Sequence, residues 1–254
     1  MSPTSRGRLF AQVADLYDEV RPDYPDHLYD VLSTVAGPLD GRHVLDLAAG
    51  TGLASRALSA RHAQVVAMDI SAGMLTALRR RTPSVPAVAA SGEHLPFRPH
   101  AFDLIVCATA WHWVETEPAV EEIRRVLRPG GHLALWWANH RWADGIDWEA
   151  AQSAVYERWA QLHGSRPPDR TGVGPRDAAD DLRDRGLDVV VDTELTWERE
   201  VSREEHLDVL RTHSDNLALG DRREEFLAQV TEALQPWPRV TERLWGPLVV
   251  ARVS

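Results

Sequence analysis

The stretch HVLDLAAGTG, residues 43–52, decides the fold of this chain. Its first half, from His43 to Leu47, is a mainly apolar run typical of a strand buried in a parallel sheet. Two alanines and a Gly-Thr-Gly turn follow, and a helical pattern rich in alanine and leucine begins at once. Glycine lets a ligand come close to backbone N–H groups because it carries no Cβ. Strand, small-residue turn and helix, in this order, indicate a nucleotide-binding α/β unit.

Strands and helices alternate from this stretch to residue 139. The apolar runs predict strands at 43–48, 64–69, 85–90, 102–108 and 133–138, and helical spacing predicts helices at 52–61, 72–81 and 118–127. Ser71 is expected to cap the helix at 72–81, since serine accepts a hydrogen bond from the first helical turn. This alternation predicts an α/β protein with a parallel sheet and right-handed crossovers.

The two ends of the chain give weaker patterns. Pro22 and Pro25 separate two expected helices at the start of the chain. Beyond residue 140 the patterns alternate less regularly. We expect helices at 9–19, 25–36, 147–163, 177–185, 202–214 and 221–235, a loop at 164–176, and strands at 187–196 and 243–252.

Composition excludes several classes of function. The net charge is −10, all 28 basic residues are arginine, and lysine-based chemistry is therefore excluded. An acidic chain without a basic stripe is a poor partner for nucleic acid. The single cysteine, Cys107, allows no disulfide framework, and we expect no metal site. No run of 18 residues lacks charge, so we expect a cytoplasmic protein with no membrane partner.

Asp69 stands at the end of the second strand, where an acidic residue can accept hydrogen bonds from two ribose hydroxyls. It can equally cap the following helix. The glycine turn lacks the spacing of a dinucleotide fingerprint, and no lysine is present to complete a phosphate-binding loop. The turn and Asp69 are typical of a nucleotide-binding α/β unit, and the role of Asp69 as a ribose ligand or as a helix cap stays open at this point.

Five motifs in order, DLAAGTG, VAMDISAGML, GEHLPF, FDLIV and VLRPGG, resemble class I S-adenosylmethionine-dependent methyltransferases. The similarity is to the small-molecule branch that includes ubiquinone-biosynthesis and trans-aconitate methyltransferases, and it covers about residues 9–140. It implies a Rossmann-like, doubly wound, mostly parallel seven-stranded sheet with helices on both faces and a helical lid. It also implies S-adenosyl-L-methionine as cofactor. The implied units are an N-terminal helical lid segment (1–36), a cofactor-binding core (37–142), a helical insertion or lid (143–185), and final strands with inserted helices (186–254).

The resemblance also implies which residues hold the cofactor. Asp46 would lie near its ammonium, Asp69 would hold the ribose hydroxyls, and Arg21 would pair its carboxylate. Ala48 stands where the family most often has glycine, and Ser91 where it often has an acid. The implied cofactor contacts are Tyr17, Arg21, Asp46, Ala48, Gly50, Gly52, Asp69, Ile70, Met74, Ser91, Gly92, Glu93, Ala108 and Thr109.

Trp111-His112-Trp113 follows the fourth strand directly, and ligands in open α/β sheets lie beyond the carboxyl ends of strands. Tryptophan offers an apolar wall, and histidine offers an acid or a base near neutral pH. His112 is the candidate catalytic residue, either as a base or as a group that positions the substrate. The candidate substrate contacts are Tyr24, Trp111, Trp113, His140 and Arg141. Trp136 and Trp137 point to opposite faces of one strand and are expected in the core.

We expect a methyltransferase acting on a small molecule, with transfer to a carboxylate or hydroxyl oxygen. The expected assembly is a monomer or homodimer. Two alternatives stay open at this point. The chain could bind the cofactor and catalyse a rearrangement or cyclisation without methylation, or it could be a non-catalytic cofactor-binding module.

Overall fold

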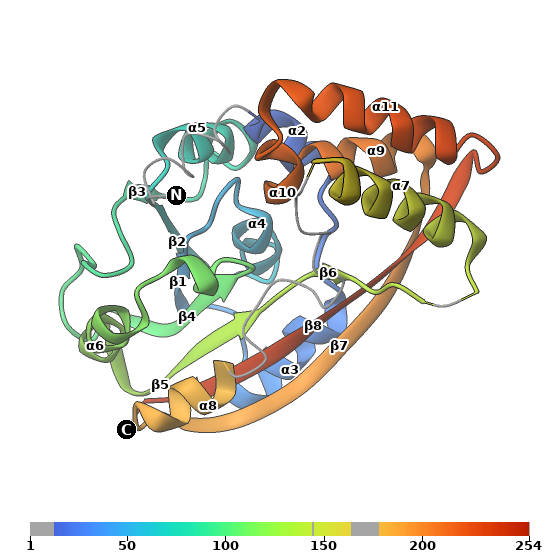
Figure 1. Ribbon diagram of the computed structural model, residues 1–254. Helices are drawn as coiled ribbons and strands as arrows, with labels where there is room; N and C mark the ends of the chain where they lie inside the picture. Colours follow the sequence, from blue (N-terminus) through green and yellow to red (C-terminus); the bar gives the residue numbers. More distant parts are fainter. Residues whose placement is uncertain (1–12, 144, 164–177, 254) are drawn as a thin grey trace.

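The structure is a computed structural model that describes residues 13–143, 145–163 and 178–253 (Figure 1). Residues 9–12 of the first expected helix and the loop expected at 164–176 lie outside the described residues.

One mixed sheet forms the centre of the molecule, in the order β3-β2-β1-β4-β5-β8, with β6 and β7 both paired to β8. Strands β1 to β5 run parallel, and Leu45 of β1 lies opposite Val66 of β2 and Ile105 of β4. The strands are β1 (His43–Leu47), β2 (Gln64–Asp69), β3 (Ala87–Ala89), β4 (Phe102–Ala108), β5 (Leu127–Trp136), β6 (Asn139–His140), β7 (Asp188–Ser202) and β8 (Arg239–Arg252). The predicted mostly parallel, doubly wound sheet is confirmed. The two-residue strand β6 is an addition to the seven strands expected.

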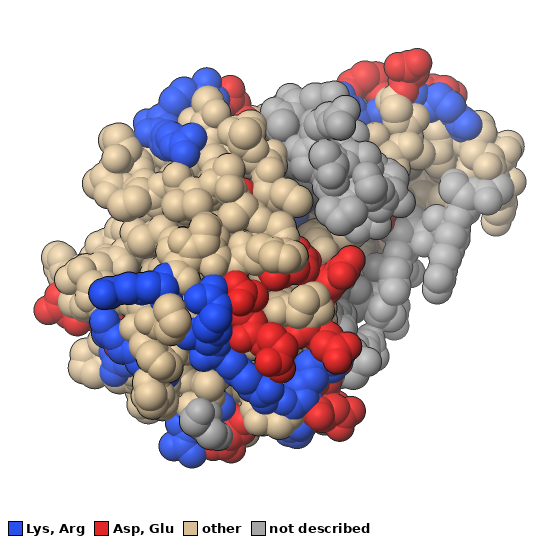
Figure 2. Space-filling view, turned by 90° about the vertical axis from the view of Figure 1, so that its left-hand side faces the viewer, with Lys and Arg blue, Asp and Glu red and all other residues tan. Residues whose placement is uncertain are grey.

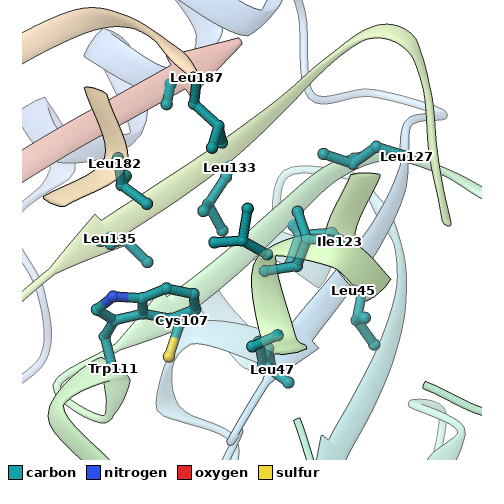
Figure 3. Packing of buried hydrophobic residues seen from close by; sticks show 14 of the residues in the cluster. Leu45, Leu47, Cys107, Trp111, Ile123, Leu127, Leu133, Leu135, Leu182 and Leu187 are labelled. Atoms are coloured by element: carbon teal, nitrogen blue, oxygen red, sulfur yellow. The ribbon is translucent and has the colours of Figure 1, made fainter. Parts of the chain in front are cut away.

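Helices cover both faces of this sheet (Figure 1). Helices α3 (Asp26–Ala36), α4 (Leu53–Ser59) and α5 (Ala72–Arg81) pack on one face. On the other face, α6 (Thr116–Val126) and α8 (Ala178–Asp184) pack against Leu133 and Leu135, and Figure 3 shows the leucines and Cys107 of this core. Ser71 caps α5 as predicted, because its Oγ accepts a hydrogen bond from the Met74 N–H at 3.4 Å.

The last two long strands depart from the prediction in length. β7 continues to Ser202 instead of ending at 196, and β8 begins at Arg239 instead of 243. Cross-strand ion pairs stabilise the added part: the Arg199 Nε lies 2.6 Å from Glu242, and Arg239 pairs with Glu200. The charged residues in these added parts obscure the apolar alternation. The sequence pattern therefore ended β7 too early and began β8 too late.

The lid consists of α7 (Asp147–His163), which follows β6, and of α9 (Arg203–Arg211), α10 (Ser214–Leu217) and α11 (Arg223–Ala233), which lie between β7 and β8 in the chain. The helix expected at 202–214 is thus divided into α9 and α10. The Ser202 and Glu205 side chains form a capping box that starts α9 where β7 ends. The lid has its own apolar core, which includes Trp148, Trp159 and Phe226. Figure 1 shows the lid helices gathered beyond one end of the sheet, beside α2 (Ala14–Val20).

Charges of opposite sign are interspersed on the face of the molecule in Figure 2. Ion pairs such as Arg124–Glu121 and Arg185–Asp181 join charges of opposite sign on the protein. Among the described residues, none of the helices has the length and apolar character needed to cross a membrane.

Candidate functional site

The turn after β1 is tied to the end of β2 by the carboxylate of Asp69. Its Oδ2 accepts a hydrogen bond from the Gly50 N–H at 2.9 Å, and its Oδ1 accepts one from the Ser71 N–H at 2.7 Å. Burial raises the pKa of Asp69 above its usual range, although both hydrogen bonds favour the ionised form. A carboxylate has room for more than two hydrogen bonds, so Asp69 keeps acceptor capacity toward the cavity that it lines.

Ala48 adopts a left-handed backbone conformation with φ +56°. This conformation suits glycine and disfavours residues that carry a Cβ. The position at which the sequence departs from the family pattern is therefore one where glycine would relieve backbone strain. Ala48 still lines the cavity, as the resemblance implies.

Two residues of the implied cofactor set lie behind the turn. Asp46 is fully buried, its Oδ2 accepts a hydrogen bond from Ser55 Oγ at 2.6 Å, and its Oδ1 has no partner among the described residues. Burial raises the pKa of Asp46 to about 7. Gly52 begins α4, where a Cβ would lie 2.9 Å from the Leu78 side chain. Neither residue is part of the cavity lining, so both support the turn from behind.

A cavity of about 330 Å³ opens over the carboxyl ends of β1, β2 and β4 and continues under the lid helices. The volume lies within the range of small-molecule sites. Of the residues implied to hold cofactor or substrate, most come together in its lining: Tyr17, Arg21, Tyr24, Ala48, Gly50, Asp69, Ile70, Met74, Ser91, Gly92, Glu93, Ala108, Thr109, His112, Trp113 and His140.

One end of the cavity has the features of a nucleoside site. Ile70 is half exposed, and Met74 is buried on α5 beside it. Glu93 accepts hydrogen bonds from Ser91 Oγ and, at 2.9 Å, from the Glu115 N–H. Burial opposes ionisation of Glu93, but these hydrogen bonds lower its pKa. The family often has an acidic residue at position 91. Here Ser91 instead donates a hydrogen bond to the acidic side chain of Glu93.

The end of β4 is held in an unusual conformation. Thr109 has φ +54°, which is rare for a β-branched residue, and its Oγ1 lies 3.3 Å from the Tyr24 hydroxyl. Tyr24 also packs edge-on against Trp136, with ring centroids 5.5 Å apart. Strained backbone of this kind concentrates at functional sites. Tyr24 therefore belongs to the wall beside the strand end, and it is not part of a surface turn.

Arg21 makes a contact that the sequence did not predict. Its Nε donates to Thr212 Oγ1 at 2.9 Å and its Nη2 to the Thr212 carbonyl at 3.0 Å, at the end of α9. Its guanidinium also lies over the ring of Tyr17, 4.7 Å from the centroid. Arg21 lines the cavity and joins the N-terminal segment to the lid.

The Trp-His-Trp triplet forms a short 3₁₀ helix whose three side chains point to different surroundings. Trp111 is 2% exposed and packs in the core beside Cys107 and Leu135, as Figure 3 shows, so the prediction that it contacts substrate is wrong. Trp113 and His112 line the cavity. The Nε1 of Trp137 lies 3.2 Å from Nδ1 of His112.

This contact determines which ring nitrogen of neutral His112 carries the hydrogen. Tryptophan Nε1 can only donate, so Nδ1 of His112 accepts and Nε2 bears the ring hydrogen. Trp136 and Trp137 are both buried, in cores on opposite faces of the sheet, as predicted.

The two candidate substrate contacts that follow β5 also have different surroundings. His140 lines the cavity, and burial lowers its pKa to about 4. Arg141 lies outside the lining and forms an ion pair with Glu194 of β7. The prediction that Arg141 contacts substrate is therefore wrong.

The lid contributes residues to the cavity that sequence reasoning missed. Gln152 and Tyr156 are four residues apart on α7, and His206, Val209 and Leu210 recur at helical spacing along α9. His213, between α9 and α10, also lines the cavity. The sequence predicted a lid over the strand ends, but it did not indicate which residues of the lid helices face the cavity.

Comparisons with known proteins agree with this geometry. Residues 45–135 match the family model described as a methyltransferase domain. An uncharacterized methyltransferase of Mycobacterium bovis is 40% identical over 128 residues, which are 50% of this chain and 51% of that protein. A demethylmenaquinone methyltransferase of Paenarthrobacter aurescens is 38% identical over 137 residues, 49% of this chain and 54% of that protein.

A solved structure from Anaeromyxobacter dehalogenans, a proposed type II methyltransferase, superimposes with a TM-score of 0.68. It is 25% identical, and the match covers 91% of this chain and 97% of that one. The chain spans about half the length of the first curated relatives it matches. The resemblance to methyltransferases is confirmed, and residues 45–135 match a methyltransferase domain.

We expect Ala48→Gly to stabilise the protein by up to about 1 kcal/mol. Relief of a left-handed alanine is worth ~1–2 kcal/mol, and the greater freedom of glycine in the unfolded chain offsets part of it. Urea denaturation measures the difference. Ala57→Gly in α4 is the control and should cost about 1 kcal/mol, since no left-handed strain is relieved there. Equal losses in both variants would contradict the assignment of strain to residue 48.

We expect Asp46→Asn to remove a pH dependence of stability. The folded-state pKa of Asp46, about 7, is above the ordinary 3.8, so its stabilising contribution is present below about pH 4 and is lost as the pH rises through about 7. Relative to the variant, the parent should lose on the order of 4 kcal/mol or less over this window. Urea denaturation of both proteins at several pH values measures it, and an unchanged difference would contradict the raised pKa.

Proposed function

We propose that this chain, with its methyltransferase domain at residues 45–135, is an S-adenosylmethionine-dependent methyltransferase that transfers methyl to an oxygen of a small molecule. The observation that carries the proposal is the continuity of the cavity. It runs from the glycine turn and Asp69, past Thr109 and His112, to the chamber under the lid helices. Cofactor and substrate would thus meet at the end of β4.

The residues present fit the proposed cofactor. Asp69 offers acceptor capacity for a ribose diol, and the half-exposed Ile70 with Met74 offers apolar surface for an adenine. The unpartnered Oδ1 of Asp46 lies behind the turn, and an ammonium group bound nearby would favour the ionised form of this carboxyl group. Arg21 and Tyr17 supply the donors for a carboxylate on the opposite side.

When bound, the cofactor supplies an electrophilic methyl group on a sulfonium. The protein's contribution is alignment, because displacement at carbon requires nucleophile, carbon and leaving sulfur in line. Holding that geometry can account for about 7–11 kcal/mol of barrier lowering. Tyr24, Thr109 and Trp113 form the rigid walls beside the transfer point, and the lid helices exclude water from it.

His112 fits a positioning role better than the role of a general base. Its Nδ1 accepts the Trp137 hydrogen bond, so Nε2 presents a hydrogen and not a lone pair. Such a donor can orient a carboxylate or phenolate oxygen with the oxygen lone pairs left for the methyl carbon. An ionised carboxylate needs no base, which supports an oxygen nucleophile that reacts without deprotonation by His112.

A small-molecule substrate is supported over nucleic acid by the net charge of −10 and by arginines engaged in local ion pairs. The demethylmenaquinone methyltransferases among the relatives act, by their name, on a small molecule, which supports the same assignment. The proposed location of the chain is the cytoplasm, and the proposed assembly is a monomer or homodimer.

We expect calorimetry to detect S-adenosylmethionine binding and Asp69→Asn to weaken it about 10- to 100-fold, through the loss of charged hydrogen bonds worth ~1.5–3 kcal/mol each. The control is Asp192→Asn on β7, whose carboxylate is half exposed and paired with Arg183. Thermal unfolding of each variant verifies the fold. No binding by the parent protein would refute the proposed function.

We expect His112→Ala to raise the substrate KM at least about tenfold while kcat falls less than tenfold, and His112→Gln to restore much of the affinity. Glutamine can place an N–H near the position of histidine Nε2, but it cannot accept a proton. Labelled methyl transfer to a panel of small acids and phenols measures both constants. A loss of ~10²–10⁴-fold in kcat in both variants would instead identify His112 as a general base.

A further inference from the structure

The side chain of Gln152, on α7, has one hydrogen-bonding group satisfied and one not. The residue is 0% exposed and lies in the wall of the cavity. Its Oε1 lies 2.7 Å from Nε2 of His206, whereas its amide nitrogen has no partner among the described residues. A buried donor without a partner costs about 1–3 kcal/mol, so this amide group calls for an acceptor.

The carbonyl end of the Gln152 amide faces His206, which is itself held by Glu242. Nδ1 of His206 lies 2.6 Å from Glu242 Oε1, and Arg199 Nε lies 2.6 Å from the other oxygen of Glu242. Burial alone would raise the pKa of Glu242, but the hydrogen bond and charge of His206, with Arg199, lower it to about 2. An ionised carboxylate only accepts, so His206 donates from Nδ1.

His206 thus lies between two oxygen atoms, Glu242 Oε1 at its Nδ1 and Gln152 Oε1 at its Nε2. The carbonyl end of Gln152 is thereby held on His206, and the NH₂ end is turned away from it. His206, Glu242 and Gln152 all contribute to the cavity wall.

The surroundings of this amide are aromatic. His140, Trp142 and Tyr156 line the same cavity. Tyr156 is held in place by a hydrogen bond of 3.2 Å from Asn216 to its hydroxyl. The nearby Arg199 and Arg243 are paired with Glu242 and Glu149, so each cation has its own carboxylate. A flat ring fits these walls, and the Gln152 NH₂ group offers a hydrogen-bond donor to an oxygen carried by that ring.

We infer that the deep end of the chamber is a subsite for the carboxylate of an aromatic acid, in which the Gln152 NH₂ group donates to a carboxylate oxygen. This inference rests on the proposed function, in which the other end of the same molecule receives the methyl group. Gln152 is thus a specificity-determining residue, and His206 with Glu242 positions it. The ring of the acid lies between the aromatic walls.

The test uses two probes that share a ring and a hydroxyl, 4-hydroxybenzoate and 4-hydroxybenzyl alcohol. Their binding to the protein, with S-adenosylhomocysteine present and without it, is followed by quenching of tryptophan fluorescence, because Trp142 lines this chamber. The parent protein should bind the benzoate at least about tenfold more tightly than the alcohol, which corresponds to about 1.4 kcal/mol. Equal binding of both probes would overturn the inference.

Gln152→Glu keeps an oxygen for His206 but replaces the NH₂ donor with an oxygen, so the preference for the benzoate should vanish while binding of the alcohol changes little. Gln161→Glu is the matched control, because it makes the same change at an exposed position of the same helix. Should Gln152→Glu not fold, Gln152→Met removes the donor at similar volume and should reduce the preference in the same way. A preference retained in the folded variant would overturn the inference.

The two proposals can fail separately. Binding of S-adenosylhomocysteine with no preference between the probes removes the carboxylate subsite and leaves the methyltransferase proposal in place. Preferential binding of the benzoate without any binding of the nucleoside would leave the subsite and remove the methyltransferase proposal.

Discussion

The site depends on the carboxylate of Asp69, which joins the ends of two neighbouring strands. It accepts hydrogen bonds from the backbone of Gly50, in the turn after β1, and of Ser71, at the start of α5. Parallel strands bring their carboxyl ends to one edge of the sheet, but they do not fix the loops that follow. One buried acid fixes both loops here and still has acceptor capacity for a ligand.

The chamber proposed for the substrate depends on a different constraint, the length of the paired strands β7 and β8. β8 pairs with β5 only from Leu248 to Arg252, so its preceding residues continue beyond the parallel sheet together with β7. Helices α9, α10 and α11 of the lid follow β7 at that far end, and α9 begins directly after β7. Two ion pairs from β8 stabilise this arrangement. Glu242 pairs with Arg199 of β7, and Arg243 pairs with Glu149 of α7. The lid thereby stands over the strand ends.

The parts of the fold that could be predicted are those in which the signal is local. Apolar runs and the glycine turn predicted β1, β2 and β4, and Ser71 was recognised as a cap because capping is a relation within one helical turn. The β7–β8 extension was missed, since paired charges on two distant strands leave no apolar alternation in either strand.

The same limit applies to the candidate site. Asp69 was identified from its position at a strand end, and Thr109 from the family resemblance. Trp111 and Arg141 also follow strand ends, yet one packs in the core and the other pairs with Glu194, because the direction of a side chain after a strand depends on local backbone geometry. Arg21 and Gln152 meet their partners across the fold, and no sequence spacing encodes those contacts.

The histidines of the cavity show why residue type alone does not assign a role. His112 has Nδ1 committed to an N–H donor, so its hydrogen is on Nε2, whereas both ring nitrogens of His206 face oxygen atoms, of Glu242 and Gln152. Burial keeps His140 neutral, with its pKa at about 4. Each ring is set by its neighbours. The chamber thus offers hydrogen-bond donors, His112 near the strand ends and the Gln152 amide under the lid, and two donors favour a substrate that carries acceptor oxygens at both ends.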